Sequence, residues 1–179
     1  DRFNIANTPG PLGSALRSDF PEVQQFCRLG KMRSSGILQY GESAVEPEEV
    51  LVVDNAFFSV FDFDLILGNK QKALLGPDEV VITQRMVVKL FGRDWQTADQ
   101  VIGKQLEFSG GRVLVVAGVA QNPPANSHIQ FDVLLSCRYD ELNSPYYNWD
   151  NNNYQTYILL HPKADAEALN RKLYRHLDK

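Results

Sequence analysis

Residues 48–61 read EEVLVVDNAFFSVF, and this stretch predicts a buried strand followed directly by one or two turns of helix. The run VLVV before Asp54 is continuously apolar, which is typical of a strand covered on both faces. Phe57, Phe58 and Phe61 then recur at i, i+1 and i+4, a spacing that places them on one side of a helix. We therefore expect a sheet against which a short aromatic helix packs.

The segments on either side extend this pattern in both directions. Apolar positions predict helices over residues 12–20 and 84–91, with Thr83 as the N-cap of the second helix and Gly92 as its C-terminal stop. Ser109-Gly110-Gly111 predicts a hairpin turn between two strands. About eight short strands and four helices follow, without regular β-α-β alternation, which favours the α+β class.

The distribution of these elements predicts two lobes. Residues 35–125 are mainly strands and turns, whereas both chain ends pair a helix with strands. We therefore expect an α/β lobe formed by residues 1–34 and 126–179, with a mostly-β lobe formed by residues 35–125 inserted into it. Residues 143–153, NSPYYNWDNNN, are a loop by composition.

Composition excludes several classes of protein. The chain has 179 residues, with 18 Lys and Arg against 22 Asp and Glu, and a net charge of −4 that argues against a nucleic-acid binder. No apolar run approaches the roughly 20 residues that cross a bilayer. The chain starts at Asp1 without a methionine or a signal peptide, so we expect a fragment of a longer protein.

The motifs of common catalytic sites are missing from the sequence. Residues 102–105, IGKQ, lack the earlier glycine and the hydroxyl of a phosphate-binding loop, and no G-x-S-x-G elbow occurs. His128, His161 and His176 lie far apart, without the paired spacing of metal ligands on a helix. We therefore predict no catalytic, cofactor-binding or metal-binding residue, no cofactor and no enzymatic activity.

Two features leave alternatives open. Cys27 and Cys137 fall in strand-like runs, and two buried free thiols are favoured over a disulfide between them. Tyr146, Tyr147 and Trp149 stand on the polar loop, where aromatic side chains are typical of a partner-contact patch. The other interpretation of this loop is a lid folded over the protein's own core, and the sequence does not separate the two.

Six segments occur in a fixed order along the chain. They are TPGPLGSALRSDFPEVQQFCRL (8–29), VLVVDNAFFSVFDFDLILGN (50–69), DEVVITQRMVVKLFG (78–92), VIGKQLEF (101–108), VLVVAGVAQNPPANSHIQFDVLLS (113–136) and YILLHPKADAEALNRKL (157–173). Together they resemble the MacB-like periplasmic core domain of FtsX/MacB-type ABC transporter permeases. The form of residues 122–132, with Asn-Pro-Pro before SHIQFD, is most similar to permeases of Bacteroidetes.

The resemblance implies an α+β fold with a porter-like lobe and an inserted β-rich lobe. It implies a periplasmic domain between two membrane helices of a permease at the inner membrane, which transmits ATP-driven movement for export, lipoprotein handling or regulation of envelope partners. The implied partners are a cytoplasmic ABC ATPase, a second permease copy, a periplasmic adaptor or envelope protein, and the membrane through flanking helices, but no nucleic acid. The alternative is a free-standing periplasmic module that binds proteins or peptides.

Overall fold

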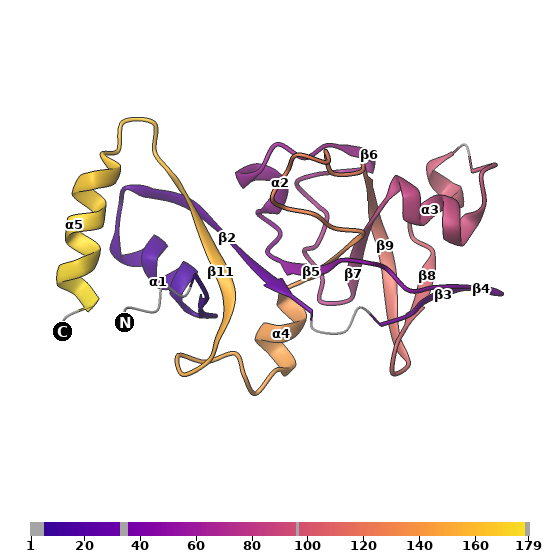
Figure 1. Cartoon of the computed structure of the whole chain (residues 1–179), viewed down its shortest axis with the longest axis horizontal. Helices are drawn as coiled ribbons and strands as arrows, with labels where there is room; N and C mark the ends of the chain where they lie inside the picture. The colour runs from indigo at the N-terminus through magenta and orange to yellow at the C-terminus, as the bar shows by residue number, and fades with distance from the viewer. Residues whose placement is uncertain (1–5, 33–35, 96, 178–179) are drawn as a thin grey trace.

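One mixed sheet organises the protein (Figure 1). The structure is a computed structural model that describes residues 6–32, 36–95 and 97–177. Across the sheet the strand order is β1–β11–β2–β5–β10–β7–β9–β8–β3–β4, and β6 pairs with β9. The strands are β1 (Thr8–Pro9), β2 (Val23–Lys31), β3 (Leu38–Tyr40), β4 (Ser43–Val45), β5 (Val50–Val53), β6 (Leu65–Gly68), β7 (Glu79–Thr83), β8 (Gln105–Phe108), β9 (Arg112–Ala120), β10 (Val133–Ser136) and β11 (Asn152–Leu160).

The helices are short and lie beside this sheet. They are α1 (Leu12–Asp19), α2 (Phe57–Val60), α3 (Gln84–Phe91), α4 (Arg138–Asn143) and α5 (Ala166–Leu177), with a 3₁₀ turn at Ala98–Gln100. Strand β5 pairs in parallel with β10 and β7 pairs in parallel with β9, whereas the other strand pairs are antiparallel. This mixture confirms the predicted α+β class.

The aromatic helix predicted after β5 is confirmed as α2. Phe57 is fully buried, and its ring lies 5.2–5.7 Å, between centroids, from the rings of Phe58, Phe61, Phe63 and Phe131. Several of these rings meet edge to face, the arrangement that aromatic quadrupoles favour. The cluster covers one face of the sheet around β5 and β10.

Helix α3 covers part of the opposite face. Its Met86, Val87 and Leu90 are buried, and Gly92, with a φ of 87°, ends the helix as predicted. Thr83 stands at the predicted N-cap, but its side chain makes no capping hydrogen bond. Its Oγ1 is instead buried without a hydrogen-bond partner among the described residues, so this part of the prediction is wrong.

One predicted turn and one predicted loop can be compared with the structure. The hairpin between β8 and β9 is confirmed, since Gly110 and Gly111 adopt φ values of 87° and 81°, a region that favours glycine. The loop predicted over residues 143–153 is shorter than expected. Helix α4 ends at Asn143 and β11 begins at Asn152, which leaves residues 144–151 as the loop.

The first and last helices lie at one end of the molecule. Helices α1 and α5 lie together there, whereas α3, β3 and β4 lie at the opposite end (Figure 1). A small apolar core joins them, in which Leu169 of α5 packs with Phe20 and Val23. The boundaries of the two lobes stay a prediction; β10, which belongs to the predicted outer lobe, pairs on both sides with strands of the predicted inserted lobe.

Candidate functional site

Arg28 is a buried cation on an interior strand of the sheet. It lies in β2 with 1% of its surface exposed, and β2 runs between β11 and β5. Its neighbours Cys27 and Leu29 are also buried, and because strand side chains alternate they face the opposite side of the sheet. A guanidinium stays charged in proteins, so its burial requires hydrogen-bond acceptors.

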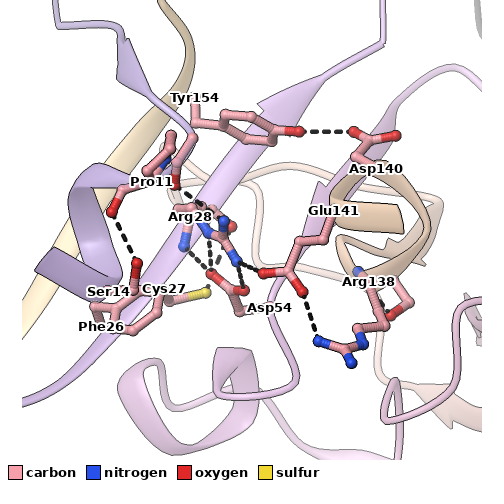
Figure 2. A network of polar contacts seen from close by, with 12 residues as sticks. Pro11, Ser14, Phe26, Cys27, Arg28, Asp54, Arg138, Asp140, Glu141 and Tyr154 are labelled. Carbon is pink, nitrogen blue, oxygen red and sulfur yellow. Dashed lines mark hydrogen bonds and ion pairs between the residues drawn. The ribbon is translucent and has the colours of Figure 1, made fainter. Parts of the chain in front are cut away.

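Two carboxylates accept hydrogen bonds from this guanidinium (Figure 2). Arg28 Nε and Nη2 donate to Asp54 Oδ2 and Oδ1 over 2.9 Å and 2.5 Å, and Nη2 also donates to Glu141 Oε1 over 2.6 Å. The backbone N–H of Arg28 donates to Asp54 Oδ2 over 2.7 Å. Asp54 directly follows β5 and Glu141 lies in α4, so Arg28 joins two elements to its own strand.

The remaining donors of Arg28 hold two loops. Its Nη1 donates to the carbonyl oxygen of Gly10 over 3.0 Å and to the hydroxyl of Tyr147. All five N–H groups of the guanidinium therefore have an acceptor, and no donor is left for a ligand. We call Arg28, Asp54, Glu141, Gly10 and Tyr147 the Arg28 junction.

Gly10 is required by close packing within the Arg28 junction. A Cβ atom at this position would lie 2.6 Å from the ring of Tyr147, closer than carbon atoms approach. The absence of a side chain lets the turn before α1 approach the tyrosine ring closely. The same ring lies 5.2 Å from the guanidinium carbon of Arg28, within cation–π range.

The charges of the Arg28 junction stabilise one another. Burial lowers the pKa of Arg28, but hydrogen bonds and the charge of Asp54 raise it more, so the net pKa lies above its ordinary value. Burial raises the pKa of Glu141, but the hydrogen bond and charge of Arg28 outweigh it and the net pKa is lowered. Arg138 also donates to Glu141 Oε2 over 3.0 Å, so two cations balance the two carboxylates.

Helix α4 has a second link to the sheet. Tyr154 of β11 donates from its hydroxyl to Asp140 Oδ2 over 2.7 Å, as Figure 2 shows. Burial raises the pKa of Tyr154, so its hydroxyl stays protonated and able to donate at neutral pH. Through Tyr154 and Arg28, α4 is tied to both β11 and β2. The arrangement holds the turn before α1, helix α4 and Tyr147 against β2.

The three aromatic residues of the predicted contact loop do not act together. The Tyr147 side chain packs inward on the Arg28 junction, whereas Tyr146 and Trp149 are 63% and 56% exposed. Trp149 contributes to an apolar groove of about 340 Å³ between α1 and α5. The groove is lined by Leu12, Ala15, Leu16, Asp19, Phe20, Trp149 and Leu173. A partner-contact role for the loop stays a prediction.

The described cysteine and histidine side chains form no common site. Cys27 and Cys137 are buried free thiols, as expected, and burial raises the pKa of both. His128 Nε2 lies 3.4 Å from the hydroxyl of Tyr157, and His161 is exposed; the side chain of His176 lies outside the described residues. Within the described ranges, no three His, Cys, Asp or Glu side chains are grouped to hold a metal ion.

The sequence matches the family described as the MacB-like periplasmic core domain over residues 3–175. The chain belongs to this family. It is thus a periplasmic domain of a MacB-like ABC transporter permease. None of the helices in the described part of this MacB-like domain has the length and apolar character to span a membrane. A search of curated proteins finds no match.

Solved structures share the fold of this MacB-like domain. A domain of a putative permease from Porphyromonas gingivalis is 24% identical, with a TM-score of 0.79 over 97% of this chain and 78% of the other. The periplasmic region of MacB from Actinobacillus actinomycetemcomitans is 15% identical, with a TM-score of 0.69 over 97% and 74%. The extracellular domain of the noncanonic ABC-type transporter YknZ from Gram-positive bacteria is 17% identical, with a TM-score of 0.61 over 94% and 79%.

Sequence reasoning missed the Arg28 junction. The available signal was one arginine inside the strand-like run FCRLG, where a charge on a covered strand demands a partner. Asp54, at the end of the apolar run VLVV, was the natural candidate for that partner. Glu141 carries no comparable signal, because it stands in a polar helix that faces solvent on its other side.

Proposed function

We propose that this MacB-like domain transmits an ATP-driven conformational change from the membrane part of its permease to the periplasm. The movement would serve export, lipoprotein handling or the regulation of envelope partners, at the periplasmic face of the inner membrane. In this proposal a cytoplasmic ABC ATPase supplies the energy and the domain carries out no reaction itself. A second permease copy and a periplasmic adaptor or envelope protein are its proposed partners.

The position of α1 and α5 carries this proposal. Both helices lie at one end of the molecule, so membrane anchors attached before and after the domain would enter it side by side (Figure 1). A body held at one end moves most at its other end. The far end is formed by α3, β3 and β4.

The Arg28 junction supports the proposal because it stiffens the region next to these anchors. It fixes the turn before α1, the end of β5, helix α4 and the 144–151 loop to β2. Movement of the anchors would then pass to the whole sheet instead of being absorbed by local rearrangement. A distant ATPase affects the domain only through a difference in free energy between two arrangements.

Distance measurements on the full-length permease with its ATPase, reconstituted in lipid, test the proposal. Spin labels on Ala44→Cys in β4 at the far end and on Asn170→Cys in α5 report the distance between two permease copies by pulsed electron resonance. Both positions are exposed, and the two native thiols are buried, so labelling is selective. We expect trapping of the ATPase with ATP and vanadate to change the Ala44 distance more than the Asn170 distance. Unchanged distances at both positions would refute transmission.

We further propose that Tyr146 and Trp149 contact a periplasmic partner. Their exposure on one loop supports this, since exposed aromatic side chains contribute strongly to protein interfaces. In the full-length permease, Trp149→Ala should weaken binding of the purified partner, whereas Gln24→Ala on an exposed position of β2 should not. Equal binding by both variants would exclude the loop from the interface.

A further inference from the structure

A cleft of about 390 Å³, with both polar and aliphatic lining residues, lies on the face of the sheet opposite to Arg28. Its floor is aliphatic and buried, and consists of Leu29 of β2, Leu51 of β5 and Ile129 in the segment before β10. This volume lies within the range of small-ligand sites. The cleft joins strands from both chain ends to β5, and none of its residues belongs to the Arg28 junction.

A ladder of polar side chains from β11 forms one wall of the cleft. Asn153, Gln155 and Tyr157 occupy alternate positions of the strand and all line the cleft. Alternate residues of a strand are about 6.7 Å apart, which is also the repeat of any extended peptide. Gln155 pairs across the sheet with Leu29, so the ladder stands directly beside the aliphatic floor.

The amide groups of this wall, and that of Asn7, which also lines the cleft, are available to a ligand. The side chains of Asn7 and Asn153 make no hydrogen bond to another residue of the described part of the chain, and Gln155 only accepts a long one, of 3.4 Å, from the hydroxyl of Tyr157. Side-chain amides carry both a donor and an acceptor. They therefore match peptide groups, which also present one donor and one acceptor each.

The opposite rim of the cleft has no net charge. Lys31 Nζ lies 2.7 Å from Glu49 Oε1 and 2.7 Å from Oε2, so the two charges neutralise each other. A charged metabolite would have to compete with this ion pair and would find no excess of either sign. An uncharged ligand with alternating donors and acceptors suits the site better. The aliphatic floor favours a ligand that also brings an aliphatic side chain.

We propose that this cleft binds an extended, uncharged peptide segment that places one aliphatic side chain on Leu29, Leu51 and Ile129. The amides of Asn153 and Gln155 pair with peptide groups at successive two-residue steps of the ligand. The proposal goes beyond the transmission of movement, because it concerns binding by this chain alone. It therefore stands or falls without regard to the behaviour of the full permease.

Titration of the 179-residue chain with short peptides, monitored by ¹H–¹⁵N NMR, tests peptide binding in the cleft. The probe is acetyl-Gly-Leu-Gly amide, and acetyl-Gly-Gly-Gly amide is the matched ligand without an aliphatic side chain. We expect the leucine peptide to shift amide resonances of β2, β11 and residues 128–130. Its affinity should be at least about tenfold above that of the glycine peptide, the factor expected for burial of a leucine side chain.

Two variants place this binding in the cleft. Gln155→Trp fills the cleft from an exposed position and should weaken binding by about tenfold or more, because the ring displaces the ligand's side chain. Gln24→Trp adds the same ring at an exposed position of β2 outside the cleft and should bind as the unaltered chain does. If Gln155→Trp does not keep a dispersed spectrum, Asn153→Trp at the neighbouring position takes its place.

Three outcomes would overturn the proposal. One is the absence of resonance shifts at millimolar peptide. Another is equal affinity for the two peptides, which would mean that the aliphatic floor contributes nothing. The last is unchanged binding by the variant with the filled cleft, which would place the peptide elsewhere.

Discussion

Replacement of Arg28 by methionine should destabilise the domain by more than the loss of any exposed charge. Methionine retains much of the aliphatic volume of arginine but supplies no hydrogen-bond donor. The Arg28→Met variant therefore leaves the side chains of Asp54 and Glu141, which are 11% and 24% exposed, without their main cation. The carbonyl of Gly10 and the hydroxyl of Tyr147 also lose their donor.

The expected loss of unfolding free energy depends on which partners Asp54 and Glu141 keep in the Arg28→Met variant. Removal of one partner from a buried ion pair costs about 3–5 kcal/mol. Asp54 keeps the backbone N–H of residue 28, and Glu141 keeps Arg138, so we expect the lower end, about 3 kcal/mol. Arg138→Met is the matched control, because it removes a cation from the same Glu141 at a site that is 57% exposed. Such exposed pairs contribute about 0–1 kcal/mol.

Equilibrium unfolding in guanidinium chloride, followed by tryptophan fluorescence, measures both variants. A domain of this kind has a free energy of unfolding of about 5–15 kcal/mol, so Arg28→Met should remain folded in buffer. Adding Asp54→Asn to Arg28→Met should restore part of the loss, because it removes the uncompensated charge. A loss for Arg28→Met within 1 kcal/mol of that for Arg138→Met would refute the view that the Arg28 junction holds this region together.

Three further predictions concern close packing, pH and the aromatic core, each measured by equilibrium unfolding. Gly10→Ala should lower the free energy of unfolding by about 1–3 kcal/mol, because its Cβ would lie 2.6 Å from the ring of Tyr147. Gly76→Ala is the control, since only the flexible Glu79 side chain lies near that position. Equal stability of the two variants would contradict the prediction. The pKa of Glu141 is lowered in the folded state, so the stability it contributes is present above its unfolded pKa of about 4.3 and is lost as pH falls through the folded pKa. Glu141→Gln should therefore lose less stability in acid than the unaltered chain does. Identical profiles of stability against pH would exclude this contribution. Phe57→Ala should cost about 3–5 kcal/mol, as for other fully buried rings, and a loss below 1 kcal/mol would mean that the surrounding rings collapse into the cavity.

The sequence was most informative where one local property decides the structure. The apolar run before Asp54 and the phenylalanines after it predicted β5 and α2, because burial of such residues is a property of the segment itself. Gly92 and the Gly110–Gly111 pair predicted a helix end and a hairpin, because their backbone conformations favour glycine. The α+β class was predicted from local patterns of the same kind, those of the individual strands and helices.

The candidate site was not predictable by the same reasoning, because its contacts join distant segments. Asp54 and Glu141 are 26 and 113 residues away from Arg28, and no local pattern selects them. Helix α4, RYDELN, was missed because it has no apolar stripe and is held by polar contacts to Arg28 and Tyr154. The missing cap at Thr83 is a tertiary effect as well, since its hydroxyl is buried in the fold and makes no capping hydrogen bond.

Strand β10 is synthesised late, yet it pairs on both sides in the interior of the sheet, with β5 in parallel and with β7 in antiparallel orientation. Until residues 133–136 have emerged from the ribosome, the strands made earlier have two open edges at this place. Such edges recruit strands from other chains and lead to aggregation. We therefore expect the nascent domain to need rapid completion or chaperone protection. A chain truncated before Val133 would keep the edges of β5 and β7 unpaired at this place.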